Sequence, residues 1–436
     1  MKTKTVSLRQ CLELIIDRRG VTPKKLKSTW KADGYKVLSA NNVKSSSLQN
    51  TNQIRFVDAD TYHKWMKTEI EKDDILLTSE APAGEALLWD SDEKIVVGQR
   101  LYALRVRNTV NPWYLTYYLQ SNRGQKEIQN KCSGSTVFGI SEKMFDYIDV
   151  VLPDKTEQDK IASCIATLEF KIDNNKKIIN QLESLAKTIY DYWFVQFDFP
   201  DKNGRPYKSS GGKMVWNERL QREIPDGWEV GRLGNHIKID RGISYSSDEL
   251  MPDGIPMINL NSFHSNATYK VEGIKKYSGS YKKINLIQPY DLLICMTQQS
   301  PIDITGSSDI IGKAIILPDC FSESEVVMSM DVARLKCDQK YGRYYLKRLL
   351  DKDFFHKYMV GFASGTKIKH LHINGLMEYR CEIPDSNLIR KYNQISYTIY
   401  CKISEIIKEN QQLASLREFL LPLLMNGQVS FKSDSI

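Results

Sequence analysis

Two stretches of the chain place their apolar residues at alternating steps of four and three, which is the spacing of a heptad seam along one side of a helix. In the first stretch the seam runs unbroken through Ile161, Ile165, Leu168, Ile172, Asn175, Ile179, Leu182, Ala186, Ile189 and Trp193. The second stretch is looser and contains Ile399, Ile403, Ile406, Asn410, Leu413, then Leu416 or Arg417, Leu420 and Leu424. We therefore predict two long helices that pair with each other as an antiparallel coiled coil.

Each seam contains one asparagine, Asn175 in the first and Asn410 in the second. A buried asparagine lowers the stability of a coiled coil but fixes its register, because the amide must find a polar partner. The alternative is that either residue lies at a frayed helix edge. We predict that the interface between helices or subunits contains Ile172, Asn175, Ile179, Leu182, Ile403, Ile406, Asn410 and Leu413.

Outside the two helical stretches, short sequence segments of the first half of the chain occur again in the second half. Segments of the first half return in the same order in the second half: IIDRRG (15–20) as KIDRGI (238–243), DDILLT (73–78) as YDLLIC (290–295), and VLPD (151–154) as EIPD (382–385). Each copy starts with short β-branched runs broken by Gly, Pro and Asn, and each ends in one of the long helices. The predicted fold class is α+β, with two mixed α/β domains separated by the two helices in a pseudo-two-fold internal repeat.

These patterns divide the chain into six predicted parts. The parts are a first domain (1–155), a first spacer helix (156–194), a central linker (195–227), a second domain (228–385), a second spacer helix (386–425) and a C-terminal tail (426–436). A length of 436 residues suits two or three domains rather than one.

Composition narrows the class of protein. A formal net charge of +8 fits a polyanionic partner without proving one. The eight cysteines are scattered with no CxxC pair, which argues against a zinc ribbon and indicates reduced thiols rather than a disulfide framework. The first residues lack an apolar signal segment and no apolar run approaches the length of a membrane span, so we expect a cytoplasmic protein with no membrane partner.

The join between the two copies carries the most specific signal. From Glu183 to Asn235 it reads ESLAKTIYDYWFVQFDFPDKNGRPYKSSGGKMVWNERLQREIPDGWEVGRLGN. This stretch closely resembles the central region of the specificity subunits of type I restriction-modification enzymes. In that family a long helix ends in a WF segment, a polar NG-PYKSSGG-MVWN linker follows, and IP-GWEV opens the second recognition domain. The match covers more than forty consecutive positions.

The resemblance implies a non-catalytic, DNA-reading subunit. Each of its two target recognition domains would read one half of a bipartite site in double-stranded DNA, and the helices would set the spacing and dock two methyltransferase subunits. Those subunits would hold S-adenosylmethionine, and motor-nuclease subunits would use ATP and Mg²⁺, so no cofactor is expected in this chain. The alternatives are a fused type IIG-like restriction-methyltransferase, a stand-alone DNA methyltransferase, or a purely structural coiled-coil scaffold.

Candidate DNA contacts lie in loops and turns at equivalent points of the two copies. Gln298 and Gln299 follow the YDLLIC strand, and a glutamine amide can pair bidentately with an adenine edge. Basic residues beside the glycines of the first repeated segment, and near the SGST and SGTK turns, could contact phosphates. The predicted DNA-binding set is Arg18, Arg19, Lys131, Ser135, Thr136, Arg241, Gln298, Gln299, Thr366, Lys367 and Lys369. The alternative for each is a polar surface residue with no specific partner.

Three patterns could suggest chemistry within this chain. The segment from Asn111 to Tyr114 (NPWY) resembles the NPPY motif of adenine methyltransferases, but Asn111 and Pro112 also fit the start of a helix. Pro318-Asp319 with Asp338-Gln339-Lys340 fits a loose nuclease pattern. His370 and His372 alternate as on a strand, without further metal ligands in view. We predict no catalytic residue and no metal site in this chain.

Overall fold

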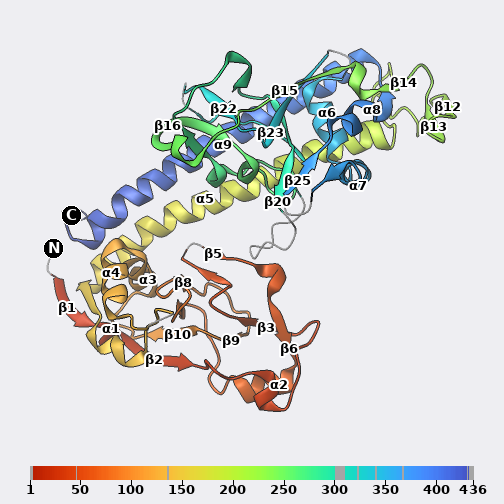
Figure 1. Cartoon of the computed structure of the whole chain (residues 1–436). Coiled ribbons are helices and arrows are strands. Elements are labelled where there is room, and N and C mark those ends of the chain that lie inside the picture. The colour runs from red at the N-terminus through yellow and green to blue at the C-terminus, as the bar shows by residue number, and fades with distance from the viewer. Residues whose placement is uncertain are drawn as a thin grey trace. The chain divides into compact units, whose positions relative to one another are not determined.

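The computed structural model describes residues 3–45, 47–134, 137–299, 310–321, 324–338, 341–365, 368–429 and 431, the side chain of Gln299 excepted. The chain divides into two compact units (Figure 1). The first consists of residues 1–173 together with 412–436, and the second of residues 174–411. Both units combine helices with β-sheets, which confirms the mixed α/β class predicted from the sequence.

A four-stranded antiparallel sheet forms the centre of the first unit. Its strands, in sheet order, are β2 (Leu12–Asp17), β10 (Leu101–Val106), β7 (Ile75–Thr78) and β8 (Ala86–Leu88). Because side chains alternate along a strand, Ile75 and Leu77 of β7 enter one hydrophobic cluster and Leu76 enters another. Burial on both faces explains why this strand reads as a continuous apolar run rather than an alternating one.

Helices cover one face of this sheet and a second, smaller sheet covers the other. The helices are α3 (Pro112–Gln120) and α4 (Asn122–Lys131), whose apolar residues share a cluster with Leu77 and Leu104. The smaller sheet consists of β6 (Arg55–Val57), β3 (Tyr35–Leu38) and β9 (Ile95–Val97), with α2 (Ala59–Trp65) beside it. Short elements complete the unit: α1 (Leu8–Cys11), the pair β1 (Thr3–Ser7) and β11 (Asp149–Pro153), and the pair β4 (Val43–Lys44) and β5 (Ser47–Leu48).

The second unit contains a four-stranded antiparallel sheet whose strands follow the same order. In sheet order these are β15 (Ile237–Arg241), β23 (Val332–Cys337), β19 (Leu292–Cys295) and β21 (Ala314–Ile316). In both sheets the first strand along the chain pairs with the fourth, the fourth with the second, and the second with the third. Leu293 and its neighbours Leu292 and Ile294 enter different clusters, so β19 is buried on both faces as β7 is.

The second unit contains further strands and helices. They are β12 (Met214–Asn217), β13 (Arg222–Pro225), β14 (Glu229–Arg232), β16 (Leu250–Ile258), β17 (Lys275–Tyr277), β18 (Leu286–Ile287), β20 (Thr297–Gln299), β22 (Val326–Met328), β24 (Ala363–Ser364), β25 (Ile368–Leu371), β26 (Arg380–Ile383), α6 (Arg343–Leu350), α7 (Asp353–Val360) and α8 (Ile373–Glu378). β14 pairs with β26 antiparallel, as β1 pairs with β11 in the first unit.

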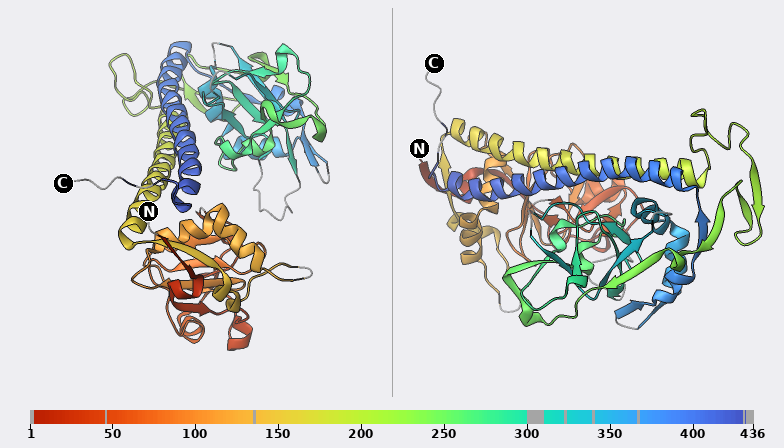
Figure 2. Two further views of the ribbon diagram at one scale, coloured as in Figure 1. Left: turned by 90° about the vertical axis from the view of Figure 1, so that its left-hand side faces the viewer. Right: turned by 90° about the horizontal axis from the view of Figure 1, so that it is seen from above.

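The two long helices are α5 (Lys155–Tyr190) and α9 (Ser386–Met425). The first predicted helix (156–194) does not continue as an α-helix to its end, because Asp191–Val195 form a π-helical turn. Within the second unit the end of α5 lies beside the start of α9 in the opposite direction (Figures 1 and 2). Asn175 Nδ2 donates to Asn410 Oδ1 at 2.9 Å, and Tyr392 Oη donates to the carbonyl of Ala186 at 3.1 Å. Asn175 is only 1% exposed, so its amide finds its polar partners, Asn410 and Glu409, on the facing helix.

Within the first unit the end of α9 contacts the start of α5. Arg417 and Glu169 form an ion pair at 3.1 Å, and the Tyr117 hydroxyl of α3 donates to Glu169 at 2.8 Å. Leu424 and Met425 are almost fully buried in the cluster formed by the sheet and α3. The last turns of α9 therefore complete the core of a unit that otherwise consists of residues 1–173.

An aromatic cluster explains the WF segment at the end of α5. Trp193 and Phe194 are buried, and the ring of Phe194 meets Tyr345 at 4.8 Å and Tyr392 at 5.2 Å between centroids. This contact joins the π-helical turn to α6 and α9, and fixes where the chain leaves the helix. The central segment then runs to the β12–β13 hairpin.

A buried network of charges joins α6 to both long helices inside the second unit. Arg348 of α6 donates to Glu183 of α5 and to the hydroxyl of Tyr400 of α9, the latter at 3.1 Å. Arg348 also pairs with Asp351 at 3.2 Å, and Asp351 binds Lys347. Burial lowers the pKa of Lys347 and raises the pKa of Asp351, so burial disfavours the charged form of each side chain. The charge of each partner offsets this effect for the other.

The eight cysteines, all within the described ranges, are free. Burial raises the pKa of Cys11 and of Cys320 to about 12, so these two thiols are protonated packing groups. No helix in the described part of the chain is long and apolar enough to cross a membrane.

Candidate nucleic-acid interface

In the first unit, segments distant in sequence meet at one edge of the four-stranded sheet. β10 runs antiparallel to both β2 and β7, so the ends of β2 and β7 lie at the same edge as the start of β10. Arg18 and Arg19 follow β2 directly, and the loop of residues 79–85 follows β7. The structure therefore brings the two predicted arginines and this loop to the same edge.

Arg19 is already engaged within the protein. Its Nε and Nη2 donate to the two carboxylate oxygens of Asp17, at 3.0 and 2.8 Å, and its guanidinium lies 3.9 Å from the ring centroid of Tyr102. Burial opposes the ionisation of Asp17, but the hydrogen bonds and charge of Arg19 outweigh it and lower the pKa of Asp17. The guanidinium is thus held between Asp17 and the ring of Tyr102, with its charge balanced by the carboxylate.

Arg18 and Lys131 are half-buried, and they flank the same edge from different elements. The Nε of Arg18 is buried with no hydrogen-bond partner among the described residues. Lys131 is the last residue of α4. Residues 132–134 and 137–140 come next, and we call them the hairpin because Ser133 and Gly139 form an antiparallel bridge. Arg18 and Lys131 remain predicted phosphate contacts.

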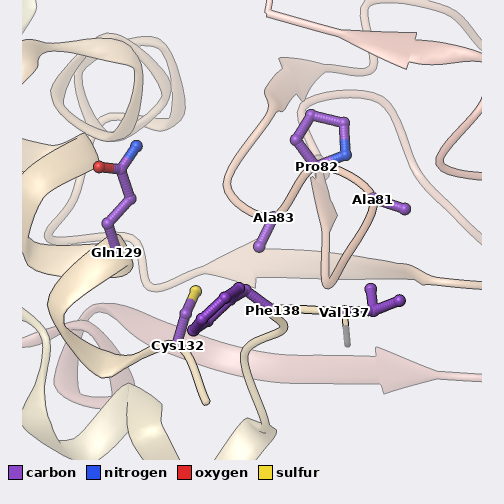
Figure 3. Close-up of a pocket in the computed structure, with 7 residues that line it drawn as sticks. All are labelled: Ala81, Pro82, Ala83, Gln129, Cys132, Val137 and Phe138. Atoms are coloured by element: carbon purple, nitrogen blue, oxygen red, sulfur yellow. The ribbon is translucent and has the colours of Figure 1, made fainter. Parts of the chain in front are cut away.

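That hairpin is bonded to the loop after β7. Ser133 and Gly139 exchange backbone hydrogen bonds at 2.9 and 3.0 Å, and Ile140 N donates to the carbonyl of Ser79 at 2.8 Å. Between the hairpin and the loop lies a hollow of about 470 Å³ (Figure 3). Its lining residues are Ala81, Pro82, Ala83, Gln129, Cys132, Val137 and Phe138.

The second unit has the corresponding edge. Arg241 is the exposed last residue of β15, and β20 follows β19 after a single residue. β20 pairs antiparallel with β25, which places Gln298 opposite Lys369 and Gln299 opposite Ile368. The predicted residues Gln298, Gln299 and Lys369 therefore share one three-stranded sheet, although about seventy positions separate them in the sequence.

The structure corrects the prediction for Gln298. The residue lies in a strand rather than a surface loop, and its side chain is only 3% exposed. Its Oε1 accepts hydrogen bonds from the backbone of Ile310 and Ile311 at 2.9 and 3.0 Å. Bidentate recognition of adenine needs both Oε1 and Nε2, so a glutamine whose oxygen is already occupied cannot supply it. Gln298 instead holds the segment that precedes β21.

We expect Gln298→Ala to destabilise the protein because two buried N–H groups lose their acceptor. The free energy of unfolding should fall by about 1–3 kcal/mol, measured by denaturant titration. Gln288→Ala, at an exposed position of the same unit, is the matched control and should change stability little. Equal stability of the two variants would show that the burial of Gln298 contributes nothing.

Five predicted contacts cannot be placed in this way. Ser135, Thr136, Thr366 and Lys367, and the side chain of Gln299, lie outside the part of the chain that the structure describes. They remain predictions from the sequence.

The patterns that suggested chemistry have structural explanations. Asn111 is the N-cap of α3, where its Oδ1 accepts from Tyr114 N at 3.0 Å, and Pro112 is the first helical residue. The helix-start interpretation is therefore confirmed. Asp319 pairs with Lys408, and Asp338 meets His236, so the two aspartates of the nuclease-like pattern have separate partners. Within the described ranges no three His, Cys, Asp or Glu residues are grouped as a metal site would require.

This chain is similar to known proteins in both its sequence and its fold. Residues 2–184 match the model of the type I restriction modification DNA specificity domain. The chain is 24% identical to the type I restriction enzyme MjaIX specificity subunit of Methanocaldococcus jannaschii, over 82% of this chain and 78% of that protein. It is 23% identical to the HindI specificity subunit of Haemophilus influenzae, over 83% and 88%. The crystal structure of a type I S subunit from M. genitalium has the same fold, with a TM-score of 0.56 over 97% of this chain and 96% of that one, at 15% identity.

Proposed function

We propose that this chain is a specificity subunit of a type I restriction-modification system and that each of its units reads one half of a bipartite DNA site. The observation that carries the proposal is the equivalent sheet edge of the two units. At that edge Arg18 and Arg19 directly follow β2 in the first unit, and Arg241 is the last residue of β15 in the second. Two similar reading edges in one chain suit a target with two separate halves.

We propose further that α5 and α9 act together as one antiparallel coiled coil that separates the two recognition domains. Helices of 36 and 40 residues span on the order of 54–60 Å at about 1.5 Å per residue. The antiparallel contacts found within each unit support a continuous pair related by a pseudo-two-fold repeat. In this arrangement the length of the helices sets the gap between the half-sites.

The chemistry of the system would lie in partner subunits. We infer that two methyltransferase subunits with S-adenosylmethionine, and motor-nuclease subunits with ATP and Mg²⁺, assemble on this chain and on double-stranded DNA. The role of Asn111 as a helix cap supports this inference, because it explains the segment that most resembled a methyltransferase motif. A fused type IIG-like enzyme is not favoured, since the similar proteins named above are specificity subunits.

Domain replacement tests the division of labour between the units. Exchanging residues 1–150 for the first domain of another specificity subunit should change one half of the methylated motif and leave the other half intact. Exchanging residues 228–385 is the reciprocal control and should change only the other half. The motif is read by methylome sequencing of cells that carry each chimera with its methyltransferase. A change in both halves after a single exchange would contradict the one-domain, one-half-site assignment.

A further inference from the structure

An apolar patch is exposed at the reading edge of the first unit. Directly before Gly139, Phe138 is 66% exposed and Val137 is 43% exposed. Their side chains form part of one wall of the hollow, and Ala81, Pro82 and Ala83 lie across from them (Figure 3). We call this site the apolar hollow. An exposed apolar patch of this kind is suited to contact with an apolar group on a ligand.

The apolar hollow is held open by hydrogen bonds in both of its walls. On the loop side, Thr78 Oγ1 donates to the carbonyl of Pro82 at 2.6 Å, and Gln125 Nε2 donates to that of Gly84 at 2.8 Å. On the hairpin side, two backbone hydrogen bonds join Ser133 to Gly139, the residue that follows Phe138. The walls are therefore preformed, so binding a group there needs little ordering of the chain.

We propose that the apolar hollow receives the C5-methyl group of a thymine in the half-site that the first unit reads. This inference rests on the proposed function. The thymine methyl is the apolar group that base pairs present in the major groove, and it is recognised by contact with apolar side chains. Gln129 at the rim of the hollow carries the amide type that pairs with the edge of adenine. The combination favours an A·T pair.

Charge around the hollow agrees with a DNA ligand. Lys131 precedes Cys132 directly, and Arg19 lies at the same sheet edge. Glu80, the acidic residue beside the hollow, is paired with Arg100 at 2.9 Å. The carboxylate that would repel a phosphate is thus neutralised within the protein.

The second unit differs at the equivalent position. There Ser364 pairs with His370 as Ser133 pairs with Gly139, which aligns Val137 with Ile368 and Phe138 with Lys369. Ile368 is 48% exposed, so both units expose an aliphatic residue at this position, whereas the exposed aromatic residue is found in the first. The first half-site should therefore depend on thymine methyl groups more strongly than the second.

The experiment replaces thymine by deoxyuridine, which lacks the methyl group and keeps the base pair. The full complex of this chain with its methyltransferase is titrated with duplexes that carry its methylated motif, with one thymine replaced at a time on either strand. At one position of the first half-site, affinity should fall about fourfold, the change expected for one buried methyl group. With Phe138→Ala the same replacement should cause no further loss, and Phe138→Leu should restore part of the sensitivity. Tyr147→Ala, which removes another exposed ring of this unit (63%), should behave as the unchanged protein.

The outcomes separate this inference from the proposed function. A complex that methylates a bipartite motif but tolerates deoxyuridine throughout the first half-site overturns the thymine assignment and leaves the proposed function intact. Equal sensitivity to deoxyuridine with and without Phe138 also overturns it, because the methyl group would then be read elsewhere. The lack of any bipartite motif in cells that carry this chain and its methyltransferase would instead contradict the proposed function itself.

Discussion

Inserting four residues into α5 after Asn180 should lengthen the non-specific middle of the methylated motif by one or two base pairs and leave both outer halves unchanged. Four residues add about 6 Å of helix, and the duplex rises about 3.4 Å per base pair. Asn180 is exposed between Ile179 and Leu182, so the insertion adds length without replacing a packed residue. Four residues also shift the heptad phase, so the smaller increase is expected.

A second insertion keeps the heptad phase of both helices, so any change in spacing can be assigned to helix length alone. Seven residues after Asn180, combined with seven in the facing segment of α9 between Ile403 and Ile406, keep the seam in register. They add about 10 Å, equivalent to about three base pairs. Methylome sequencing reads the spacing directly. A folded, active insertion variant that retains the original spacing would show that the length of the helices does not set the distance between the half-sites.

Arg348→Met should destabilise the second unit strongly. The side chain of Arg348 is 7% exposed and its partner Glu183 is 14% exposed. Removing the cation leaves the Glu183 carboxylate with the Tyr400 hydroxyl, which donates to it at 3.1 Å, but without its ion-pair partner. Breaking a buried ion pair in this way typically costs about 3–5 kcal/mol of unfolding free energy. Thermal and denaturant unfolding of the full chain measure this loss. Lys402→Met, which removes an ion pair whose side chains are 60% and 67% exposed, is the matched control and should change stability little.

A second variant shows whether the loss comes from the charge. In the double variant Arg348→Met with Glu183→Met, both members of the pair are apolar, and Lys347 still balances Asp351. Replacing a whole buried pair by apolar residues is often neutral or stabilising. Stability should therefore recover most of what Arg348→Met loses. If it falls further instead, packing of the side chains rather than their charge determines the stability of the site.

Sequence patterns within single segments predicted the long helices, the central strands and one helix cap, because these depend mainly on residues close together in the chain. The heptad seam gave both long helices, because a helix repeats its burial every three or four residues. The apolar runs DDILLT and YDLLIC became the central strands β7 and β19, each buried on two faces. The Asn111-Pro112 pair also behaved as a helix start, since capping depends on neighbouring residues only.

Features that depend on distant partners were not accessible in this way. Gln298 looked like a loop residue because its strand exists only through pairing with β25, which comes about seventy positions later. Arg348 stands in an ordinary helical segment, and its partner Glu183 is 165 positions away. The apolar hollow likewise joins the loop at Ala81 to the hairpin at Phe138. The periodicity of a single segment does not predict contacts between residues that are far apart in the sequence.

The discontinuous first unit has a consequence for how the protein is made. Its core includes Leu424 and Met425, whereas the rest of the unit ends at Asp173. Translation from residue 173 to residue 412 covers 412 − 173 = 239 residues, which takes about 12–50 s at roughly 5–20 residues per second. During that interval the first unit leaves the ribosome with an uncovered apolar surface, while residues 174–411 can fold as they emerge. The unit that is synthesised first is thus completed last, and a chain terminated before α9 ends would leave that surface open to chaperones and to aggregation.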